Sequence, residues 1–441
     1  MNHGEAPPMV QLQLYRPLPL HLRMMLAFIL GACMPMAFSP TDMAWLGVAA
    51  LAGWFLLLWT QQHTFWMGWI FGLGWFGVGA FWLADTFHLY GGLPYGVAVP
   101  IVMLVGLILG LFPALWGWLS EKIGGKSIWF LLSFILLAPL IEWLRGHLFT
   151  GLPWTVLGNL TVDTVAVGWV SVVGAYGASI LPTAMAACMA ALFIQRLQRA
   201  ALAGLLLLGV LVACAPSIVV PEADQRVALI QGNVPQDQKW DAAFLQETLN
   251  RYNDLTTAVA ADVDLIVWPE ATLPFFLEDL PRYDRWVMDK MEEWQRPLLF
   301  GGLKLLQAGE SGRMGQNGLY LFDPDKSART FVGKHHLVPF GEYVPSWLPW
   351  IHQLVAGIAD FMPAEDRGVL VYGDQRLGSL ICYESIFPEE ARSRVIAGAN
   401  VLVLVTNDAW YGQSPAGWQH LQAARMRAVE TGRYLLRAAN T

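Results

Sequence analysis

The stretch LGSLICYESIFPEEAR, Leu377 to Arg392, decides what kind of fold the second half of the chain has. An apolar run ends at Cys382, and Tyr383 and Glu384 follow at once. Such a run is typical of a buried strand. Its end presents a thiol beside a carboxylate, at a place where proteins concentrate function. We therefore expect a sheet-based enzyme domain around this stretch.

The region after Arg226 alternates short apolar strands with amphipathic helical segments. We predict helices at 243–259, 284–294, 388–397 and 417–431, and a last strand at 434–440. The other predicted strands are RVALIQGN (226–233), DLIVWPE (264–270, ending at its Pro), RPLLFGG (296–302), NGLYLFD (317–323), GVLVY (368–372), RLGSLIC (376–382) and NVLVLVTND (400–408). A hairpin is expected around Gly373 and Asp374. This order predicts an α+β or α/β layered domain of residues 219–441.

The first half of the chain has the composition of a membrane domain. Of the 441 residues, 55% are hydrophobic and only 14% are charged, against roughly a quarter in an average soluble protein. Charged residues are scarce up to Ser217 and crowd together after Val219. A span needs about 20 apolar residues, so residues 1–218 predict about seven helices. Their approximate bounds are 22–38, 43–60, 65–84, 96–119, 127–144, 165–194 and 200–216.

The positions of Lys and Arg predict the orientation of these spans. Cations gather in loops that fall on one side if the N-terminus is cytoplasmic: Arg16, Arg23, Lys122, Lys126, Arg196 and Arg199. The opposite loops carry one clear cation, Arg145, near a span end beside Glu142. These two can pair with each other, or Arg145 can bind a lipid phosphate. An odd number of spans places residues 219–441 in the periplasm of a bacterium with an inner membrane.

Charge and cysteine content exclude several classes of function. The net charge is −7 and no Lys/Arg run is present, so nucleic-acid binding is not expected. Three of the four cysteines lie in hydrophobic segments, which leaves Cys382 as the one cysteine of the polar half. No cysteine spacing resembles a disulfide framework or a zinc site. His335 and His336 point to opposite faces of an extended chain. We expect neither a metal nor a cofactor.

Three polar residues at predicted strand ends make a complete set for acyl transfer. Cys382 supplies a thiol, Glu270 a carboxylate that can take its proton, and Lys334 an ammonium. A carboxylate in a dry site can act as the base for a thiol nucleophile. A fixed positive charge then stabilises the oxyanion of the tetrahedral intermediate. The three residues together predict covalent acyl transfer without a histidine.

Seven segments carry a resemblance to a known family: EWLRGHLFTGLPW (142–154), QGNVPQDQKW (231–240), VWPEATLP (267–274), NGLYLFDP (317–324), KHHLVPFGEYVP (334–345), ICYESIFPE (381–389) and TNDAWYGQSPAGWQH (406–420). With these segments and the preceding spans, the chain resembles the nitrilase superfamily and, within it, the apolipoprotein N-acyltransferases. The resemblance covers nearly the whole chain. It implies a multi-span α-helical membrane domain followed by a nitrilase-like α-β-β-α sandwich outside the cytoplasm.

The resemblance also implies roles for individual residues. It makes Cys382 the nucleophile, Glu270 the general base and Lys334 the oxyanion group. Glu342 is implied as a supporting carboxylate, and positions near the active site or lipid access are Trp240, Tyr383 and Glu384. The implied acyl donor is a phospholipid, typically phosphatidylethanolamine. The acceptor is the free amine of a diacylglyceryl-cysteine in an apolipoprotein, reached through a thioester by a protein expected to be a monomer.

Two further expectations concern the segment 343–354 and the chain end. The aromatic and Pro-rich YVPSWLPWIHQL (343–354) is expected to pack normally or to act as a lid that dips into the bilayer. In the family the segment RYLLRAANT runs on into further strands and a last span. The chain is therefore expected to be truncated, with an exposed sheet edge.

Two other functions stay open at this point. A membrane-tethered nitrilase-type amidase would use the same three residues with water as the acceptor. A transporter or receptor with an extracytoplasmic binding domain would need polar residues in mid-span, and Glu142 is among the few candidates.

Overall fold

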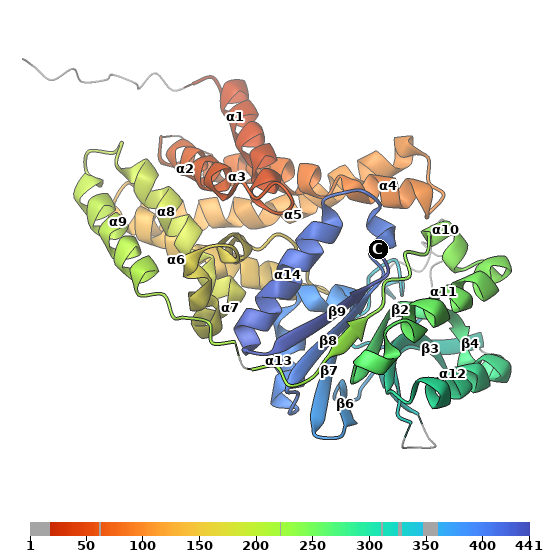
Figure 1. Cartoon of the computed structure of the whole chain (residues 1–441). Helices are drawn as coiled ribbons and strands as arrows, with labels where there is room; N and C mark the ends of the chain where they lie inside the picture. Colours follow the sequence, from red (N-terminus) through yellow and green to blue (C-terminus); the bar gives the residue numbers. More distant parts are fainter. Residues whose placement is uncertain (1–17, 61–62, 221, 310–311, 325–328, 347–359) are drawn as a thin grey trace, which may run out of the picture.

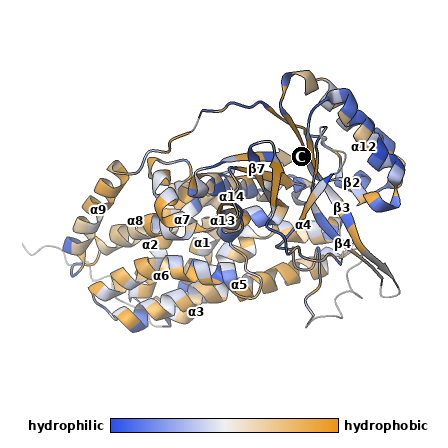
Figure 2. Ribbon diagram, turned by 90° about the horizontal axis from the view of Figure 1, so that it is seen from below, coloured by the Kyte–Doolittle hydropathy of each residue, from blue (hydrophilic) through white to orange (hydrophobic). Residues whose placement is uncertain are grey.

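The computed structural model describes residues 18–60, 63–220, 222–309, 312–324, 329–346 and 360–441. Apolar helices form one side of the molecule, and two sheets with their covering helices form the other (Figure 1). Coloured by hydropathy, the first half is dominated by hydrophobic helices, whereas helices such as α12 of the second half are hydrophilic (Figure 2). The predicted division into an apolar helical part and a layered part therefore has a structural counterpart. From residue 347 on, the predicted lid lies outside the described residues.

Nine helices of the first half are described: α1 (Leu20–Cys33), α2 (Ala44–Thr60), α3 (Thr64–Gly72), α4 (Trp82–Leu89), α5 (Tyr95–Gly124), α6 (Ile128–His147), α7 (Val170–Ala178), α8 (Ile180–Ala191) and α9 (Gln198–Ala213). Within the described residues, three helices (20–37, 95–124 and 128–147) are long and apolar enough to cross a membrane. Two bent pairs raise this number to five if each is one span, and α2 and α9 are shorter apolar helices.

Two of the predicted spans are pairs of helices with a bend between them. The predicted span 65–84 bends by 49° between 64–77 and 82–89, and the predicted span 165–194 bends by 70° between 165–178 and 180–191. α7 itself has a kink at Gly174, whose φ of 69° and ψ of 175° are not helical. Apolar composition alone does not reveal such breaks. The number of membrane crossings stays a prediction.

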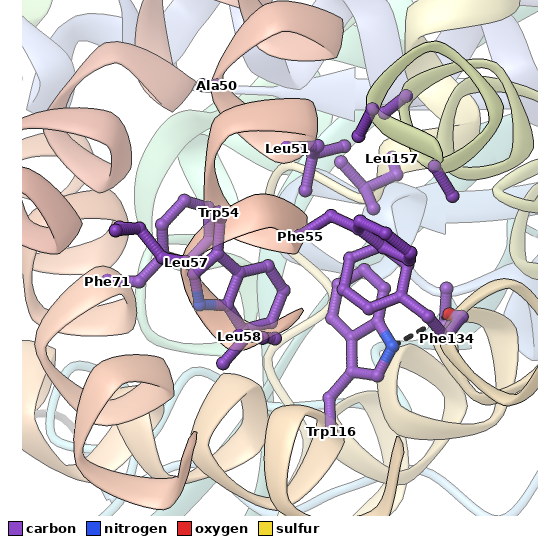
Figure 3. Packing of buried hydrophobic residues seen from close by; sticks show 14 of the residues in the cluster. Ala50, Leu51, Trp54, Phe55, Leu57, Leu58, Phe71, Trp116, Phe134 and Leu157 are labelled. Carbon is purple, nitrogen blue, oxygen red and sulfur yellow. Dashed lines mark hydrogen bonds between the residues drawn. The ribbon is translucent and has the colours of Figure 1, made fainter. Parts of the chain in front are cut away.

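Aromatic side chains fill the space between α2, α3, α5 and α6 (Figure 3). The ring of Trp54 stacks on Phe71 at 4.4 Å and meets Trp116 edge-on at 5.0 Å. The indole N–H of Trp116 donates to the carbonyl of Phe134 at 2.8 Å, so this buried polar group is satisfied. A Cβ on Gly68 would lie 2.4 Å from the carbonyl oxygen of Pro113 in α5. Small residues thus let the helices approach closely, as membrane helices commonly do.

The second half is built on two sheets. The first has the strand order β1 (Val227–Leu229), β2 (Leu265–Phe276), β3 (Leu298–Gly309), β4 (Gly312–Phe322) and β5 (Thr330–Gly333). The second has the order β6 (Val369–Tyr372), β7 (Gln375–Ile381), β8 (Val401–Thr406) and β9 (Tyr434–Ala439). β1, β2 and β3 are parallel, as are β7, β8 and β9, and β6 and β7 form the predicted hairpin. β9 lies at an edge of its sheet.

Alternation along the strands creates the layers. Leu265 and Val267 of β2 face the core between the two sheets, whereas Ile266 and Trp268 join a core beneath α11 (Leu245–Thr257) and α12 (Pro281–Trp294). In the second sheet, alternate residues of β8 do the same, with α13 (Pro388–Ile396) and α14 (Ala416–Thr431) on the outside. Since the side-chain period of a strand is two, each sheet has two apolar faces. The result is the expected α-β-β-α sandwich.

One strand runs further than predicted. β2 passes through Pro269 and ends at Phe276, so the expectation that it stops at the proline is wrong. β1 pairs with β2 only as far as Val267, so the missing N–H of Pro269 costs no hydrogen bond on that side. The register with β3 is irregular between Trp268 and Leu273, and Ala271 has a φ of 46°. Such a bulge re-aims side chains, and Glu270 lies inside it.

The two halves meet along α14. Met426 of α14 packs among Val170 and Ala175 of α7 in a buried cluster. The Glu430 carboxylate accepts a hydrogen bond from the main-chain N–H of Ala175. Near the other end of the contact, Tyr383 and Phe387 pack with side chains of the 142–154 segment. The second half of the chain thus packs on the helical half next to Cys382.

Candidate active site

Cys382 lies where β7 turns into a short 3-10 helix, Cys382–Ile386. Its side chain is buried, and its φ of 50° is in the left-handed region that a cysteine rarely occupies. Neighbouring groups hold this strained turn. His420 Nε2 lies 3.0 Å from the carbonyl oxygen of Cys382, and the Ser385 hydroxyl donates to the same oxygen at 3.0 Å. The backbone strain is what turns the thiol out of the strand.

Lys334 and two carboxylates lie together beside this turn. Lys334 follows β5 and its side chain is 1% exposed. Its Nζ donates to Glu342 Oε1 at 2.8 Å and lies 3.7 Å from Glu270 Oε1. The Asn317 amide in β4 donates to both carboxylates, at 2.8 Å to Glu270 and 3.1 Å to Glu342. Residues predicted from separate motifs are therefore brought together by the fold.

Burial controls the protonation of this group. Burial raises the pKa of the Cys382 thiol, Glu270 raises it further and Lys334 opposes them. Burial lowers the pKa of Lys334, but Glu342 and Glu270 outweigh it, so this pKa is raised. Lys334 is accordingly an ammonium and Cys382 a neutral thiol at neutral pH. Such a thiol needs a base before it can attack a carbonyl, and Glu270 is the carboxylate whose charge acts on it most strongly.

Glu384 is fully buried and bonded within the protein. Its carboxylate accepts from the main-chain N–H groups of His335, His336 and Ile381 at 2.7, 3.1 and 2.7 Å. It also pairs with the buried guanidinium of Arg394 at 3.3 Å. These bonds tie the segment after Lys334 to the strand that ends at Cys382. Because Glu384 bonds to main-chain groups and to Arg394, it stabilises the geometry of the site.

The other three predicted residues lie in different surroundings. The Tyr383 hydroxyl donates to the carbonyl of Gly151 at 3.1 Å, and Trp240 is 47% exposed. Arg145 is buried, donates to the carbonyls of Leu152 and Trp154, and lies 3.9 Å from Glu142. These contacts shape the turn at the end of α6. Arg145 Nη2 is buried without a hydrogen-bond partner, and binding of a lipid phosphate by Arg145 stays a prediction.

Sequence reasoning assigned no role to several residues around the site. His420 Nδ1 lies 3.0 Å from Asp408 Oδ1 behind the nucleophile's turn. The Asn407 N–H donates to Glu270 Oε2 at 3.0 Å, and Lys239 Nζ donates to the Glu270 carbonyl oxygen at 2.8 Å. All four lie in segments quoted for the resemblance, as Asn317 does. Their place in these segments could have marked them as candidates, but no pattern in the sequence linked them to Glu270 or Cys382.

The histidines predicted not to share an ion have separate partners. His335 Nε2 lies 3.1 Å from Asp366, and His336 Nδ1 lies 3.7 Å from Glu390. Within the described part of the chain, no group of three or more His, Cys, Asp or Glu side chains could hold a metal ion.

An apolar cavity of about 580 Å³ lies between the two halves next to the site. Residues on the helical side include Val78, Phe81 and Trp82, and those on the catalytic side include Tyr411 and Gln419. Tyr411 lies near the site, since burial raises the pKa of its hydroxyl and the charges of Cys382, Asp408 and Glu270 raise it further. The cavity is thus lined by apolar helices on one side and, on the other, by Tyr411, a residue close to the thiol.

Comparison with known proteins assigns this arrangement to a family. The chain is 35% identical to the apolipoprotein N-acyltransferase of Geobacter metallireducens, over 95% of this chain and 83% of that protein. It is 36% identical to that of Methylococcus capsulatus, over 95% of this chain and 84% of that protein. The chain belongs to the apolipoprotein N-acyltransferase family. Residues 30–189 match the family's N-terminal domain, and residues 226–441 match the carbon-nitrogen hydrolase family.

Membership of the apolipoprotein N-acyltransferases makes this protein a membrane-associated acyltransferase with a nitrilase-like domain. It favours the enzyme over the transporter or receptor alternative. Among solved structures, an amidase from Nesterenkonia sp. AN1 is similar over 49% of this chain and 78% of its own, with 20% identity and a TM-score of 0.36.

Proposed function

We propose that this protein takes an acyl chain from a phospholipid, typically phosphatidylethanolamine, and transfers it to the N-terminal amine of diacylglyceryl-cysteine in an apolipoprotein. The observation that carries the proposal is the buried thiol beside one carboxylate and one ammonium, next to an apolar cavity shared with the helical half. Both substrates are lipid-anchored. Exposing each CH₂ to water costs about 0.8 kcal/mol, so an active site seated on apolar helices avoids this cost.

In the first step, Glu270 takes the proton of the Cys382 thiol, and the thiolate attacks the ester carbonyl of the phospholipid. The carbonyl oxygen becomes an oxyanion, which the ammonium of Lys334 stabilises. The C–O bond then breaks, Glu270 returns the proton to the leaving alcohol, and a lysophospholipid departs. The acyl chain stays on Cys382 as a thioester. Glu342 keeps Lys334 charged and in place through their 2.8 Å bond.

In the second step, the free amine of the acceptor attacks the thioester. Glu270 takes a proton from the amine, Lys334 again stabilises the oxyanion, and the C–S bond breaks. The thiolate leaves as the amide forms and regains a proton from Glu270. Two substrates that use one site in turn produce ping-pong kinetics. We place the reaction at the periplasmic face of the inner membrane, with the N-terminus in the cytoplasm and the enzyme acting as a monomer.

The test is intact-protein mass spectrometry after exposure to phosphatidylethanolamine vesicles. We expect an added acyl mass that hydroxylamine removes, located on the peptide that contains Cys382. Cys382→Ala should abolish it, because alanine has no thiol sulfur on which a thioester could form. Cys214→Ala, at an exposed cysteine after α9, is the matched control and should acylate normally.

Two outcomes would contradict the proposal. Undiminished acylation of Cys382→Ala would show that Cys382 is not the nucleophile. Release of free fatty acid instead of an acylated peptide amine, when a diacylated lipopeptide is supplied, would favour the amidase-like alternative in which water is the acceptor.

A further inference from the structure

Lys239 is a second buried lysine at the site, and the mechanism above does not use it. It ends the short helix α10 (Gln236–Lys239) and is 5% exposed. Its Nζ donates to the main-chain carbonyl of Glu270 at 2.8 Å. Removing an ammonium from water costs several kcal/mol unless nearby charges compensate it. The titratable groups whose charges act on Lys239 are Glu270 in β2 and Cys382 after β7.

The segment that carries Lys239 is fastened to the same frame as the Glu270 carboxylate. The Asn407 side chain donates to Gln236 Oε1 at 2.7 Å, while its main-chain N–H donates to Glu270 Oε2 at 3.0 Å. The Asn440 amide donates to both Asn407 and the carbonyl of Val234, at 3.0 and 2.8 Å. Lys239 is therefore held at a fixed place relative to the base. A lysine at the surface would not be held by such a set of hydrogen bonds.

Two carboxyl side chains, Glu270 and Glu342, and two lysines, Lys334 and Lys239, make up this part of the buried site. Asp408, whose charge also acts on Cys382, is paired with Arg437. When the Cys382 proton moves to Glu270, the thiolate replaces Glu270 as the second anion. When the substrate carbonyl is attacked, its oxyanion replaces the thiolate. With Lys334 alone, each of these states would carry an uncompensated negative charge in a water-poor site.

We infer that Lys239 is a positioning residue of the acyl transfer, which fixes the Glu270 bulge through the main chain and supplies the second positive charge that the thiolate and the oxyanion require. This inference rests on the role proposed for Cys382. Burial lowers the pKa of Lys239 to about 8, against the opposing charges of Glu270 and Cys382. The residue is thus charged at neutral pH and loses its charge as the pH rises through this value.

The experiment compares Lys239→Met, Lys239→Gln and Lys239→Arg in the full chain. Two quantities are measured: the single-turnover rate of acyl-enzyme formation with phosphatidylethanolamine vesicles, and the pH profile of Cys382 alkylation by iodoacetamide, followed by peptide mass spectrometry. We expect Met and Gln to slow acylation about 10- to 100-fold and to move the alkylation profile up by about one pH unit. Lys239→Arg should retain most of the acylation rate and an alkylation profile close to that of the wild type. Lys290→Met, on the outer helix α12, is the control and should match the wild type.

A wild-type rate and alkylation profile in Lys239→Met would overturn the inference. Acylation at the wild-type rate by Lys239→Gln would also overturn the inference, because glutamine can donate a hydrogen bond but carries no charge. If Met and Gln do not accumulate as folded protein, Lys239→Arg decides, because arginine stays charged where lysine does not. The ratio of its rate to that of the wild type should rise between pH 7 and 9, and a constant ratio contradicts the inference. Acylation that survives Cys382→Ala would instead contradict the proposed function itself.

Discussion

Single side chains keep the nucleophile's turn in its strained conformation. Glu384, next but one to Cys382, accepts hydrogen bonds from three main-chain N–H groups and pairs with Arg394. Burial raises the pKa of Glu384, while Arg394 lowers it. On the other side of the turn, His420 contacts the Cys382 carbonyl and is itself paired with Asp408. These residues act on the thiol through the backbone.

Glu384→Gln is expected to lower the free energy of unfolding by about 2–3 kcal/mol, since it weakens a buried charged hydrogen-bond network. It should also slow acyl-enzyme formation, because the segment after Lys334 loses its anchor. Thermal unfolding in detergent micelles measures the first effect, with the exposed Glu292→Gln as the control. An unchanged melting temperature would show that the network contributes little.

Asp408 makes a pH-dependent contribution to stability. Burial raises its pKa, but His420 and Arg437 outweigh burial and hold this pKa below its usual value of 3.8. A depressed folded pKa gives stability that is present above about pH 4 and is lost as the pH falls through the folded value. Asp408→Asn should therefore be less stable at pH 7 and should lose less stability between pH 5 and 3. Melting temperatures across this range test it. The exposed Asp289→Asn is expected to follow the wild-type pH profile, and an Asp408→Asn profile that also does so would contradict the prediction.

Among the elements, β2 has the most direct effect on the chemistry. Its bulge turns Glu270 toward Lys334, and the neighbouring strand β3 leaves room for it at Gly301. A Cβ at position 301 would lie 2.4 Å from Glu270 Cα and 2.7 Å from the Pro269 carbonyl oxygen. Both neighbours are backbone atoms, so the bulge itself would have to move. The position of Glu270 therefore depends on the conformation of the bulge in β2.

Gly301→Ala should slow acyl-enzyme formation more than tenfold, since an ångström-scale displacement of a catalytic group can cost about 100-fold. It should also destabilise the protein by about 1–3 kcal/mol through overpacking. Single-turnover acylation and thermal unfolding measure the two effects. Gly417→Ala in the first turn of α14 has only ordinary contacts near 4 Å and serves as the control. Wild-type acylation by Gly301→Ala would mean that the bulge tolerates displacement.

At the scale of the whole molecule, α14 packs against α7 and joins the catalytic half to the helical half. Met426 is fully buried in this contact, where Val170 and Ala175 surround it. Arg427, also buried, donates to the carbonyl of Ile386 and pairs with Glu430. α14 also carries Gln419, which lines the apolar cavity between the two halves.

Met426→Ala is expected to cost about 2–5 kcal/mol of stability because it leaves a cavity in this contact. The matched control is Met288→Ala on α12, where the methionine is 39% exposed and the cost should be within about 0.5 kcal/mol. Thermal unfolding of the full chain in detergent compares them. Equal melting temperatures would show that the two halves are held together by other contacts.

The sequence by itself predicted an apolar first half and a layered second half, most of the elements of residues 226–441 in their order, though not α10 or β5, and Cys382, Glu270 and Lys334 as candidates. Hydrophobic periodicity and strand ends are local properties, so they are visible in a linear pattern. The predicted helices and strands of residues 226–441 all appear, and the layers follow from their alternation.

Only the tertiary structure decided where β2 ends, where two apolar helices bend, and which buried groups surround the thiol. Pro269 fits inside β2 because β1 is short, and Gly174 breaks a run that is apolar throughout. Lys239, which lies 31 residues before Glu270, donates to its main-chain carbonyl, and Asn407 and Asn440 from two other segments hold the two together. Such contacts depend on the packing of the whole domain, and no local pattern encodes them.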